Sequence, residues 1–574
     1  MSKRFSRRDF LKYSLATNIV IWTSEAMAHK LNISSKEIQI FNIPTASATS
    51  LTTFPQSVSS GDPQAHGITL WTRIIAQSEI AKVAFQVASD SAFGQVILQG
   101  FANTDKNCDY TVKIPLESTV LKPYTTYYYR FIFNQDISPI GRFKTLPSPE
   151  DKNLDNIKFA YINCQNYTNG YYNAYPFLAK EDIDFIVFLG DYIYEKVNDN
   201  SFQRGIRSLE LPSGKLIAST LEDYRFLYQA YNSDPKLQKL REKFAFITIW
   251  DDHEFANDSF QANAPDQFPF YQPELRQAAT QAWAEYTPTS IPFDANTDSI
   301  NSLQIYRKFR LGNLLELVLT DERLYRDEPP SCDNPVIQEE RYELRQRYLV
   351  SDSPQRNEAQ RTMLGHRQRD WFVEQICNSS CVWKIWGNGV MTLQLKILSV
   401  FATLFLGKRT PDLFVNLDQW DGYPAERALL FKAIKEAKVK NFVTITGDLH
   451  TFVAGYQKLN FDDQNDPPVG VEFVVGSITS SNLAEQITLN SFNVPLPQIE
   501  TVTKLIQASN PHIDYFNSDT HGYNIVEVTP EALICTFKVV SNIIKPGGKV
   551  STLKVFRVPR DQVLIEDITP TLEK

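Results

Sequence analysis

The feature that most constrains this chain is a series of short apolar runs, each of which stops abruptly at polar residues. Runs of this kind are typical of strands that are buried on both faces of a sheet. In open α/β sheets the carboxyl ends of the strands are where ligands gather. The sequence therefore predicts that Asp, His and Cys side chains meet at one edge of one sheet. The runs are residues 157–163, 185–189, 244–250, 314–320, 382–386, 442–446 and 471–475.

The polar residues that follow these runs have the chemistry of metal ligands. The chain has 7 histidines, and two of them, His253 and His450, follow apolar runs together with Asp191, Asp252 and Asp448. Carboxylates held close together repel one another, which raises their pKa values, and a bound cation offsets this repulsion. Carboxylates favour calcium, magnesium or manganese, whereas imidazole, phenolate and thiolate favour iron or zinc. The mixed set predicts two kinds of metal side by side, which suits phosphate-ester hydrolysis. The alternative at this point is a set of turn caps and salt bridges.

A different pattern precedes the apolar runs. Between residues 54 and 147, short alternating strands are separated by turn residues, for example at 67–72 and 126–131. Such spacing predicts an all-β sandwich. Residues 147–156 are polar and contain proline, so we expect a linker there. Beyond it, helical patterns alternate with the apolar runs, which predicts an α/β domain. The clearest of these helical patterns are 361–377 and 424–437.

The N-terminus has the anatomy of an export signal. A basic stretch at 3–8 precedes a short apolar stretch at 13–22, and Ala-Met-Ala follows as a cleavage pattern. The end of the basic stretch overlaps the segment Ser-Arg-Arg-Asp-Phe-Leu-Lys at 6–12, which resembles the twin-arginine export motif. We therefore expect residues 1–28 to be a signal peptide read by the twin-arginine translocase and residues 29–50 to be a poorly ordered leader. The mature protein is then expected in the periplasm or outside the cell.

Composition and charge exclude several classes of protein. The net charge of −8 means that the chain has no excess of Lys and Arg to neutralise phosphates, so we expect no nucleic-acid-binding surface. No apolar run reaches the roughly 18 residues of a spanning helix, so no transmembrane span is predicted. The 6 cysteines in 574 residues do not make a disulfide scaffold. Cys377 and Cys381 lie close enough in sequence to pair, and the sequence leaves open whether they form a disulfide or stay as thiols.

Three longer motifs carry a resemblance to a known family. They are Gly190-Asp191-Tyr192-Ile193-Tyr194-Glu195, Trp250-Asp251-Asp252-His253-Glu254 and Gly447-Asp448-Leu449-His450. Supporting blocks lie at 60–63, 70–73, 321–326, 363–371 and 420–424, in the same order as in the family. The chain resembles PhoD-type alkaline phosphatases, which are calcineurin-like metallophosphoesterases. The resemblance extends over residues 50 to 545.

This resemblance implies a fold and a division into domains. The expected fold is α/β, an αββα two-sheet metallophosphatase sandwich preceded by an all-β fibronectin- or Ig-like N-terminal domain. On this basis residues 51–147 are the N-terminal β-sandwich domain and 155–545 the catalytic domain. Residues 546–574 are expected to be a C-terminal tail.

The resemblance also implies a ligand set for Fe3+ and Ca2+. Cys164 would supply a thiolate, Tyr194 a phenolate and His450 an imidazole to ferric iron, and Asp191 would bridge iron and calcium. Asp252 and Asp448 would bind calcium, with Asn388 as a further candidate ligand.

The resemblance implies catalytic roles in addition. His253 would face the phosphoryl group, where it steadies the transition state or protonates the leaving oxygen. Asp252 and Arg323 are candidate catalytic residues beside it. Arg323 and Arg326 are candidate phosphate clamps; the alternative is that they pair with Asp321 and Asp327.

The segment 393–407 stands apart because it is strongly apolar and follows Asn388 directly. It is too short to span a bilayer. One interpretation is a buried helix, and the other is an apolar patch that makes weak contact with lipid.

Three functions are compatible with these features. The first is an exported alkaline phosphatase that hydrolyses phosphate monoesters and so scavenges phosphate. The second is a phosphodiesterase with the same metal site, acting on phospholipid headgroups, nucleic-acid ends or teichoic-acid-like polymers. The third is a calcium-dependent adhesion protein with a relict catalytic domain, and the complete set of candidate ligands argues against it.

Overall fold

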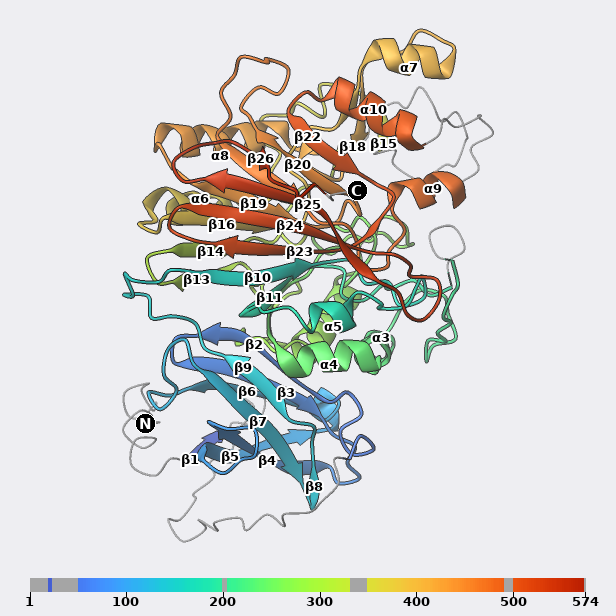
Figure 1. The fold of residues 1–574 in the computed structure, drawn as a ribbon. Helices are drawn as coiled ribbons and strands as arrows, with labels where there is room; N and C mark the ends of the chain where they lie inside the picture. The colour runs from blue at the N-terminus through green and yellow to red at the C-terminus, as the bar shows by residue number, and fades with distance from the viewer. Residues whose placement is uncertain (1–18, 23–49, 199–203, 331–347, 490–498, 572–574) are drawn as a thin grey trace, which may run out of the picture. The chain divides into compact units, whose positions relative to one another are not determined.

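The computed structural model describes residues 19–22, 50–198, 204–330, 348–489 and 499–571 (Figure 1). The predicted leader 29–50, apart from Ser50, and most of the predicted export signal lie outside the described residues. Four residues of that signal are described: Ile19–Trp22 form strand β1, which pairs in parallel with β5. Among the described residues, no helix is long and apolar enough to cross a membrane.

The chain divides into two compact units. The first consists of Met1–Ser148, Gln229–Ile247 and Ala284–Ser290, and the second of Pro149–Tyr228, Thr248–Trp283 and Ile291–Lys574. All the candidate site residues belong to the second unit.

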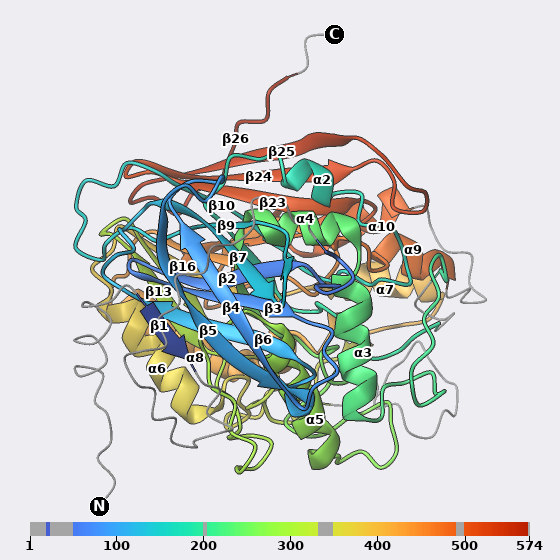
Figure 2. The same ribbon diagram turned by 90° about the horizontal axis from the view of Figure 1, so that it is seen from below.

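The first unit is built from two groups of strands. One is a sheet in the order β1-β5-β4-β7-β8, with β9 also paired to β7, and Figure 2 shows β4, β5 and β7 side by side. In the other, β2 lies between β12 and β3, and β3 pairs with β6. Their core contains Phe85, Tyr129 and Phe143, all without exposed surface. The strands are β2 (Val58–Gln64), β3 (Gly67–Arg73), β4 (Ile80–Ala88), β5 (Val96–Asp105), β6 (Thr111–Glu117), β7 (Thr126–Phe133), β8 (Asp136–Ile137), β9 (Gly141–Lys144) and β12 (Ala245–Ile249).

The second unit contains two larger groups of strands and a small three-stranded sheet. The first group runs β26-β25-β24-β23-β10-β11 and the second β13-β14-β16-β19-β21-β20-β22. The first comprises β10 (Ile157–Ile162), β11 (Phe185–Leu189), β23 (His521–Val528), β24 (Ala532–Val540), β25 (Val550–Pro559) and β26 (Glu566–Asp567). The second comprises β13 (Arg307–Leu311), β14 (Leu315–Leu319), β16 (Trp383–Asn388), β19 (Phe442–Thr446), β20 (Phe452–Gln457), β21 (Gly470–Val474) and β22 (Ile513–Asn517). The small sheet has the order β15 (Tyr348–Ser351), β18 (Leu413–Asn416), β17 (Lys396–Ile397).

Aromatic side chains join the two larger groups of strands. Phe473 of β21 lies 5.9 Å from Phe556 of β25 and 6.2 Å from Phe537 of β24, measured between ring centroids. Phe452 of β20 lies 5.3 Å from Phe537. The Tyr161 hydroxyl donates to the Phe473 carbonyl oxygen at 2.8 Å. The seven apolar runs of the sequence therefore become buried strands of a mixed α/β fold, as predicted.

The helices are α2 (Tyr175–Leu178), α3 (Leu221–Asn232), α4 (Pro235–Lys243), α5 (Pro273–Tyr286), α6 (Gly365–Asn378), α7 (Ser399–Leu406), α8 (Pro424–Glu436), α9 (Leu483–Leu489) and α10 (Ile499–Ser509). Helices α6 and α8 match the helical patterns read at 361–377 and 424–437. They pack on each other, and α6 contacts β14 (Figure 1).

Two expectations differ from the structure, and one question that the sequence left open is answered. The predicted C-terminal tail contains β25, which pairs with β24 over its whole length because its apolar side chains complete the core. The apolar segment 393–407 is not one buried helix: Leu393 and Leu395 are buried, whereas α7 exposes Val400 and Leu404. Cys377 and Cys381 are free thiols, so the disulfide that the sequence left open is not formed.

Candidate metal centre

The candidate ligands are positioned by tight turns at the carboxyl ends of strands. Cys164 follows β10 and Asp191 follows β11, with φ values of 50° and 58°. Asp448 and His450 follow β19, with φ values of 57° and 54°. These left-handed conformations turn each chain sharply just where its strand ends. The cluster therefore forms where strand ends of two sheets meet, and the prediction of one edge of one sheet was too simple.

Gly190 permits the close approach of two of these turns. Its φ is +94°, and a Cβ atom placed there would lie 2.4 Å from the Cβ of Asp251. Only glycine fits this position, because any side chain would collide with the Asp251 turn. The residue thus brings Asp191 next to the Asp251–Asp252 segment.

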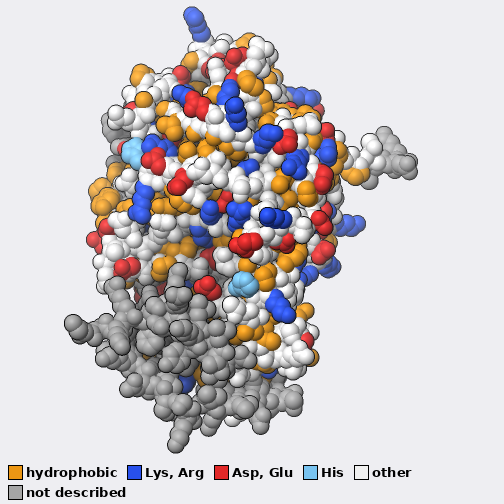
Figure 3. Space-filling model, turned by 90° about the vertical axis from the view of Figure 1, so that its left-hand side faces the viewer, with side chains coloured by type: hydrophobic (Ala, Val, Ile, Leu, Met, Phe, Trp, Pro, Cys, Tyr) orange, Lys and Arg blue, Asp and Glu red, His pale blue; other side chains and the backbone are white. Residues whose placement is uncertain are grey.

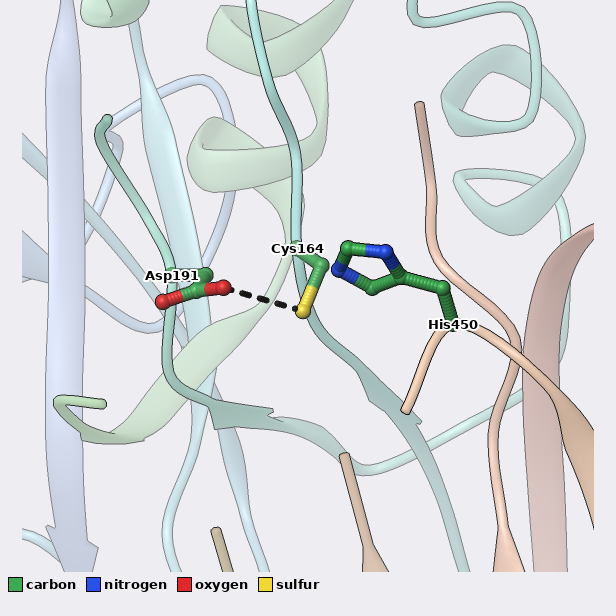
Figure 4. A group of neighbouring side chains, drawn as sticks. All are labelled: Cys164, Asp191 and His450. Carbon is green, nitrogen blue, oxygen red and sulfur yellow. Dashed lines mark hydrogen bonds between the residues drawn. The ribbon is translucent and has the colours of Figure 1, made fainter. Parts of the chain in front are cut away.

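The first group of candidate ligands combines sulfur, oxygen and nitrogen donors. One atom each from Cys164, Asp191 and His450 lies within 4.8 Å of the others (Figure 4). The Cys164 Sγ donates to Asp191 Oδ2 at 3.3 Å, and the Tyr194 hydroxyl donates to the same oxygen at 2.9 Å. His450 Nδ1 contacts the Ser481 carbonyl oxygen at 2.7 Å. The predicted thiolate, phenolate and imidazole donors are therefore brought together around one carboxylate.

The second group contains carboxylates only. Oxygens of Asp191, Asp251, Asp252 and Asp448 lie within 4.8 Å of one another. Burial, together with the neighbouring carboxylates, raises the pKa of Asp191 and of Asp448 well above the ordinary range, although His253 opposes the shift at Asp191 and Arg323 opposes it at Asp448. Asp191 belongs to both groups.

A third acidic group adjoins the second through Asp252. Oxygens of Asp252, Asp258 and Asp418 lie within 4.8 Å of one another, and all three residues are buried. The sequence reading did not single out Asp258 or Asp418. Asp418 follows the end of β18, so the strand-end argument would have found it had this short strand been recognised. Asp258 has no comparable signal in the sequence.

His253 is held on two sides. Its Nδ1 lies 2.7 Å from Oε2 of Glu195, whose side chain is completely buried, and its ring centroid lies 4.1 Å from that of Tyr194. Burial opposes a positive charge on the imidazole, but Glu195, Asp252 and Asp191 raise the pKa of His253 well above its ordinary value. Glu195 was read only as part of a motif, and the structure gives it the contact that orients the imidazole.

Glu254 fixes the two turns that carry the central carboxylates. Its carboxylate accepts hydrogen bonds from the backbone amides of Asp191, Tyr192 and Asp251, at 3.0, 2.6 and 2.8 Å. Burial raises the pKa of Glu254 to about 7. Its three amide donors explain why a carboxylate is needed here, since an amide side chain would present two donors of its own.

The structure gives the two candidate phosphate clamps other partners. Arg323 is fully buried and forms ion pairs with Asp251 and Asp418, and its Nη2 lies 3.4 Å from Asp448 Oδ1. Arg326 is also fully buried, and its Nη2 donates to Asp418 Oδ1 at 2.7 Å and to the Asp258 carbonyl oxygen at 2.9 Å. The partners are not Asp321 and Asp327, as the alternative interpretation had it. Both guanidinium groups compensate buried acids, which argues against the phosphate-clamp prediction.

Asn388 lies at the end of β16 and is fully buried. Its side-chain nitrogen donates to the Val390 carbonyl oxygen, and its Oδ1 lies 3.3 Å from the Trp420 Nε1 donor. The structure thus gives Asn388 hydrogen-bond partners other than the clustered carboxylates.

The residues present fit bound metal ions on two counts. His450 Nδ1–H donates to the Ser481 carbonyl oxygen, so the other ring nitrogen, Nε2, carries a free lone pair. This Nε2 is buried and has no hydrogen-bond partner. A metal ion would supply that partner. The buried carboxylates of the second group also carry a mutual repulsion that a cation would offset. The acidic and histidine clusters therefore fit the metal site of a metallophosphatase.

Comparisons with known proteins agree with this geometry. The family model described as "PhoD-like phosphatase" matches residues 159–537, and "PhoD-like phosphatase, N-terminal domain" matches residues 41–147. Alkaline phosphatase D of Bacillus subtilis (strain 168) is 30% identical over 548 residues, which cover 94% of this chain and 86% of that protein. The solved "Structure of PhoD" is 28% identical, with a TM-score of 0.78, and the match covers 92% of this chain and 94% of that one. The chain belongs to the PhoD-like phosphatase family.

Proposed function

We propose that this protein is an exported alkaline phosphatase that hydrolyses phosphate monoesters at a site holding Fe3+ and Ca2+. The observation that carries the proposal is the position of Asp191, whose carboxylate belongs both to the Cys164–His450 group and to the all-carboxylate group. A single carboxylate shared by a soft and a hard donor set is what a pair of unlike metals requires.

Each metal has a proposed ligand set among the residues of this cluster. Cys164, Asp191, Tyr194 and His450 would hold Fe3+, and Asp191, Asp252 and Asp448 would hold Ca2+. We add Asp251 as a neighbour that Arg323 compensates, and Asn388 stays a weaker candidate for calcium. When bound, the metals supply charge that activates water and stabilises the phosphoryl oxygens.

The protein's own residues supply the proton transfer and the orientation. Nδ1 of His253 is committed to Glu195, which leaves Nε2 as the ring nitrogen that acts on the phosphoryl group. A proton held at Nε2 passes to the leaving alcohol oxygen as the ester bond breaks. Asp252 precedes His253 and accepts a hydrogen bond from the His253 backbone amide at 3.0 Å, which fixes the turn that aims the imidazole.

The proposal extends to the architecture and to export. The aromatic contacts between the two strand groups support an αββα sandwich for the catalytic domain, 155–545, and the strands of the first unit support a β-sandwich for 51–147. The basic, apolar and small-residue pattern of residues 1–28 supports export by the twin-arginine translocase. On the face in Figure 3, basic and acidic side chains of the described residues are interspersed, so this face has no continuous basic patch of the kind that binds a polyanion.

A second candidate function is a phosphodiesterase that works on phospholipid headgroups. The observation that favours it is helix α7, where Val400 and Leu404 are 64% and 80% exposed on one face. Lys408 and Arg409, both exposed, follow the helix directly. Exposed apolar side chains beside basic ones are typical of helices that lie in an anionic lipid surface.

One comparison of rates separates the two candidates. Initial rates would be measured on a nitrophenyl phosphate monoester and on the diester with the same leaving group, with and without a calcium chelator. The proposal predicts faster monoester hydrolysis that is lost on chelation. Faster hydrolysis of the diester favours the second candidate, and a monoesterase that is indifferent to chelation contradicts the calcium assignment.

A further inference from the structure

A short loop after β21 contacts three of the four residues proposed to hold iron. We define it as the 477–482 loop, from Ser477 to Asn482. The backbone amides of Thr479 and Ser480 donate to the Cys164 carbonyl oxygen at 3.3 and 3.2 Å. Every residue of the loop is at most 3% exposed. The loop therefore packs directly against the proposed ligands and makes polar contacts with them.

Ser480 is the residue of the loop that contacts the phenol. Its Oγ donates to the Tyr194 hydroxyl at 2.6 Å, and the carbonyl oxygen of Cys164 lies 2.9 Å from the same Oγ. A serine hydroxyl has one proton, so these two acceptors share one donor. The Tyr194 hydroxyl donates its own proton to Asp191, which leaves its oxygen to accept from Ser480.

Ser481 acts on the imidazole in a different way. Its backbone carbonyl oxygen lies 2.7 Å from His450 Nδ1, so Nδ1 is the protonated nitrogen and Nε2 is directed to the centre. Its side-chain hydroxyl instead donates to Asn169 Oδ1 at 3.4 Å. The two neighbouring serines thus support two ligand residues, one through its side chain and the other through its backbone.

The loop is itself fixed at both ends by one histidine. His521 Nδ1 lies 3.0 Å from Ser477 Oγ, and His521 Nε2 lies 3.3 Å from Asn482 Nδ2. Glu485 adds a contact of 3.1 Å to His521 Nε2 and pairs with Arg204 at 2.8 Å. These contacts place both ends of the loop against one buried side chain.

From these contacts we infer that Ser480 is a positioning residue for the metal centre, which directs the Tyr194 oxygen through the hydrogen bond that its hydroxyl donates. The inference rests on the proposed function, because it takes Tyr194 to be a ligand. Hydrogen bonds to ligand atoms fix their orientation, and their loss typically weakens metal binding or activity by about 10- to 100-fold.

The test compares Ser480→Ala with Ser481→Ala in the full chain. The two variants remove the same atom from adjacent buried serines, but only Ser480 offers its hydroxyl to a ligand residue. Purified proteins would be compared for their visible tyrosinate-to-iron absorption band and for iron retained after dialysis against a chelator. We expect Ser480→Ala to shift the band to longer wavelength and to retain iron about 10- to 100-fold less tightly. Ser481→Ala should match the wild type, and Ser480→Thr, which keeps the hydroxyl, should restore the band.

The outcomes separate this inference from the function on which it rests. Wild-type protein with the band, and Ser480→Ala with an unchanged band and unchanged iron retention, would overturn the inference while the iron site stands. Equal losses in the two alanine variants would assign the effect to packing and would also overturn it. An active wild-type enzyme without iron or a visible band would refute the ligand assignment of Tyr194, and the role of Ser480 with it.

Discussion

His253 donates from Nδ1 to Oε2 of Glu195 across 2.7 Å, and no part of the Glu195 side chain is exposed. Glu195 also accepts from the Asn257 backbone amide at 2.9 Å, so both of its oxygens are engaged. A buried carboxylate held in this way fixes the tautomer and the ring plane of the histidine that it contacts. The orientation of His253 is therefore a property of the folded chain and does not depend on a substrate.

Replacing Glu195 tests this orientation. Glu195→Gln keeps the shape but removes the charge that favours Nδ1–H, so we expect kcat for a phosphomonoester to fall by about 10- to 100-fold with KM nearly unchanged. His253→Asn should lower kcat by about 100-fold or more. Because Glu195 acts through His253, the double variant should be no slower than His253→Asn alone. Independent, multiplying losses in steady-state kinetics would contradict this relationship.

Arg326 provides a contrast between a structural and a substrate-binding arginine. Its guanidinium is fully buried, pairs with Asp418 and donates to three buried backbone carbonyl oxygens. Arg326→Met should therefore leave Asp418 with Arg323 as its remaining arginine partner and the three carbonyl oxygens without this donor, and lower the free energy of unfolding by about 3–5 kcal/mol. KM should stay the same in the fraction that folds. Arg369→Met is the matched control, because Arg369 pairs with the mostly exposed Asp370 and should change stability by less than about 1 kcal/mol. A stable Arg326→Met with a much higher KM would restore the phosphate-clamp interpretation.

The sequence was most informative where local pattern determines structure. Uninterrupted apolar runs such as Phe185–Leu189 became buried strands, and the residues directly after them, Asp191 and Asp448, met as predicted. The partners of Arg323 were not predictable, because Asp418 lies 95 residues away and the two meet only through tertiary packing. Strand β25 was missed for a similar reason, since its pairing with β24 depends on the core that both strands complete. The ions themselves are not determined by chain geometry, because the same donors accept several metals.

His512 lies outside the metal centre and makes the free energy of unfolding depend on pH. Its Nε2 contacts the Gln394 carbonyl oxygen at 2.8 Å, its Nδ1 is buried without a partner, and burial lowers its pKa to about 4. The unfolded chain, with an ordinary histidine pKa near 6.5, therefore binds more protons than the folded protein between these two values. Stability should fall as the pH drops through this window.

The matching experiment compares His512→Gln with the wild type by urea unfolding at pH 7 and pH 5. Protonation of His512 in the unfolded chain should lower the free energy of unfolding of the wild type by about 2 kcal/mol from pH 7 to pH 5. The drop in the variant should be smaller than that of the wild type by this amount. The glutamine side chain is uncharged at both pH values, so the contributions of other titrating groups cancel in the difference between the two proteins. Equal losses in the two proteins would show that His512 is not held neutral by the fold.

Helix α7 is the basis of the prediction that the protein binds to anionic lipid vesicles. Leu404→Glu places a charge on its exposed apolar face, so we expect it to reduce flotation of the protein with phosphatidylglycerol vesicles by several-fold. Leu216→Glu is the matched control, because Leu216 is 62% exposed in a different part of the same unit. Both variants should hydrolyse a soluble monoester at the wild-type rate. No flotation of the wild type, or equal flotation with phosphatidylcholine alone, would remove the case for the second candidate function.

The most direct test of the central claim is to measure bound metal and phosphomonoesterase activity together in Asp191→Asn. Asp191 is the one residue shared by both ligand groups, and asparagine keeps its size while removing its charge. The account predicts that iron and calcium content fall together and that hydrolysis is lost with them, while circular dichroism shows a folded protein. Activity and metal content at wild-type levels in a folded Asp191→Asn would contradict the two-metal assignment.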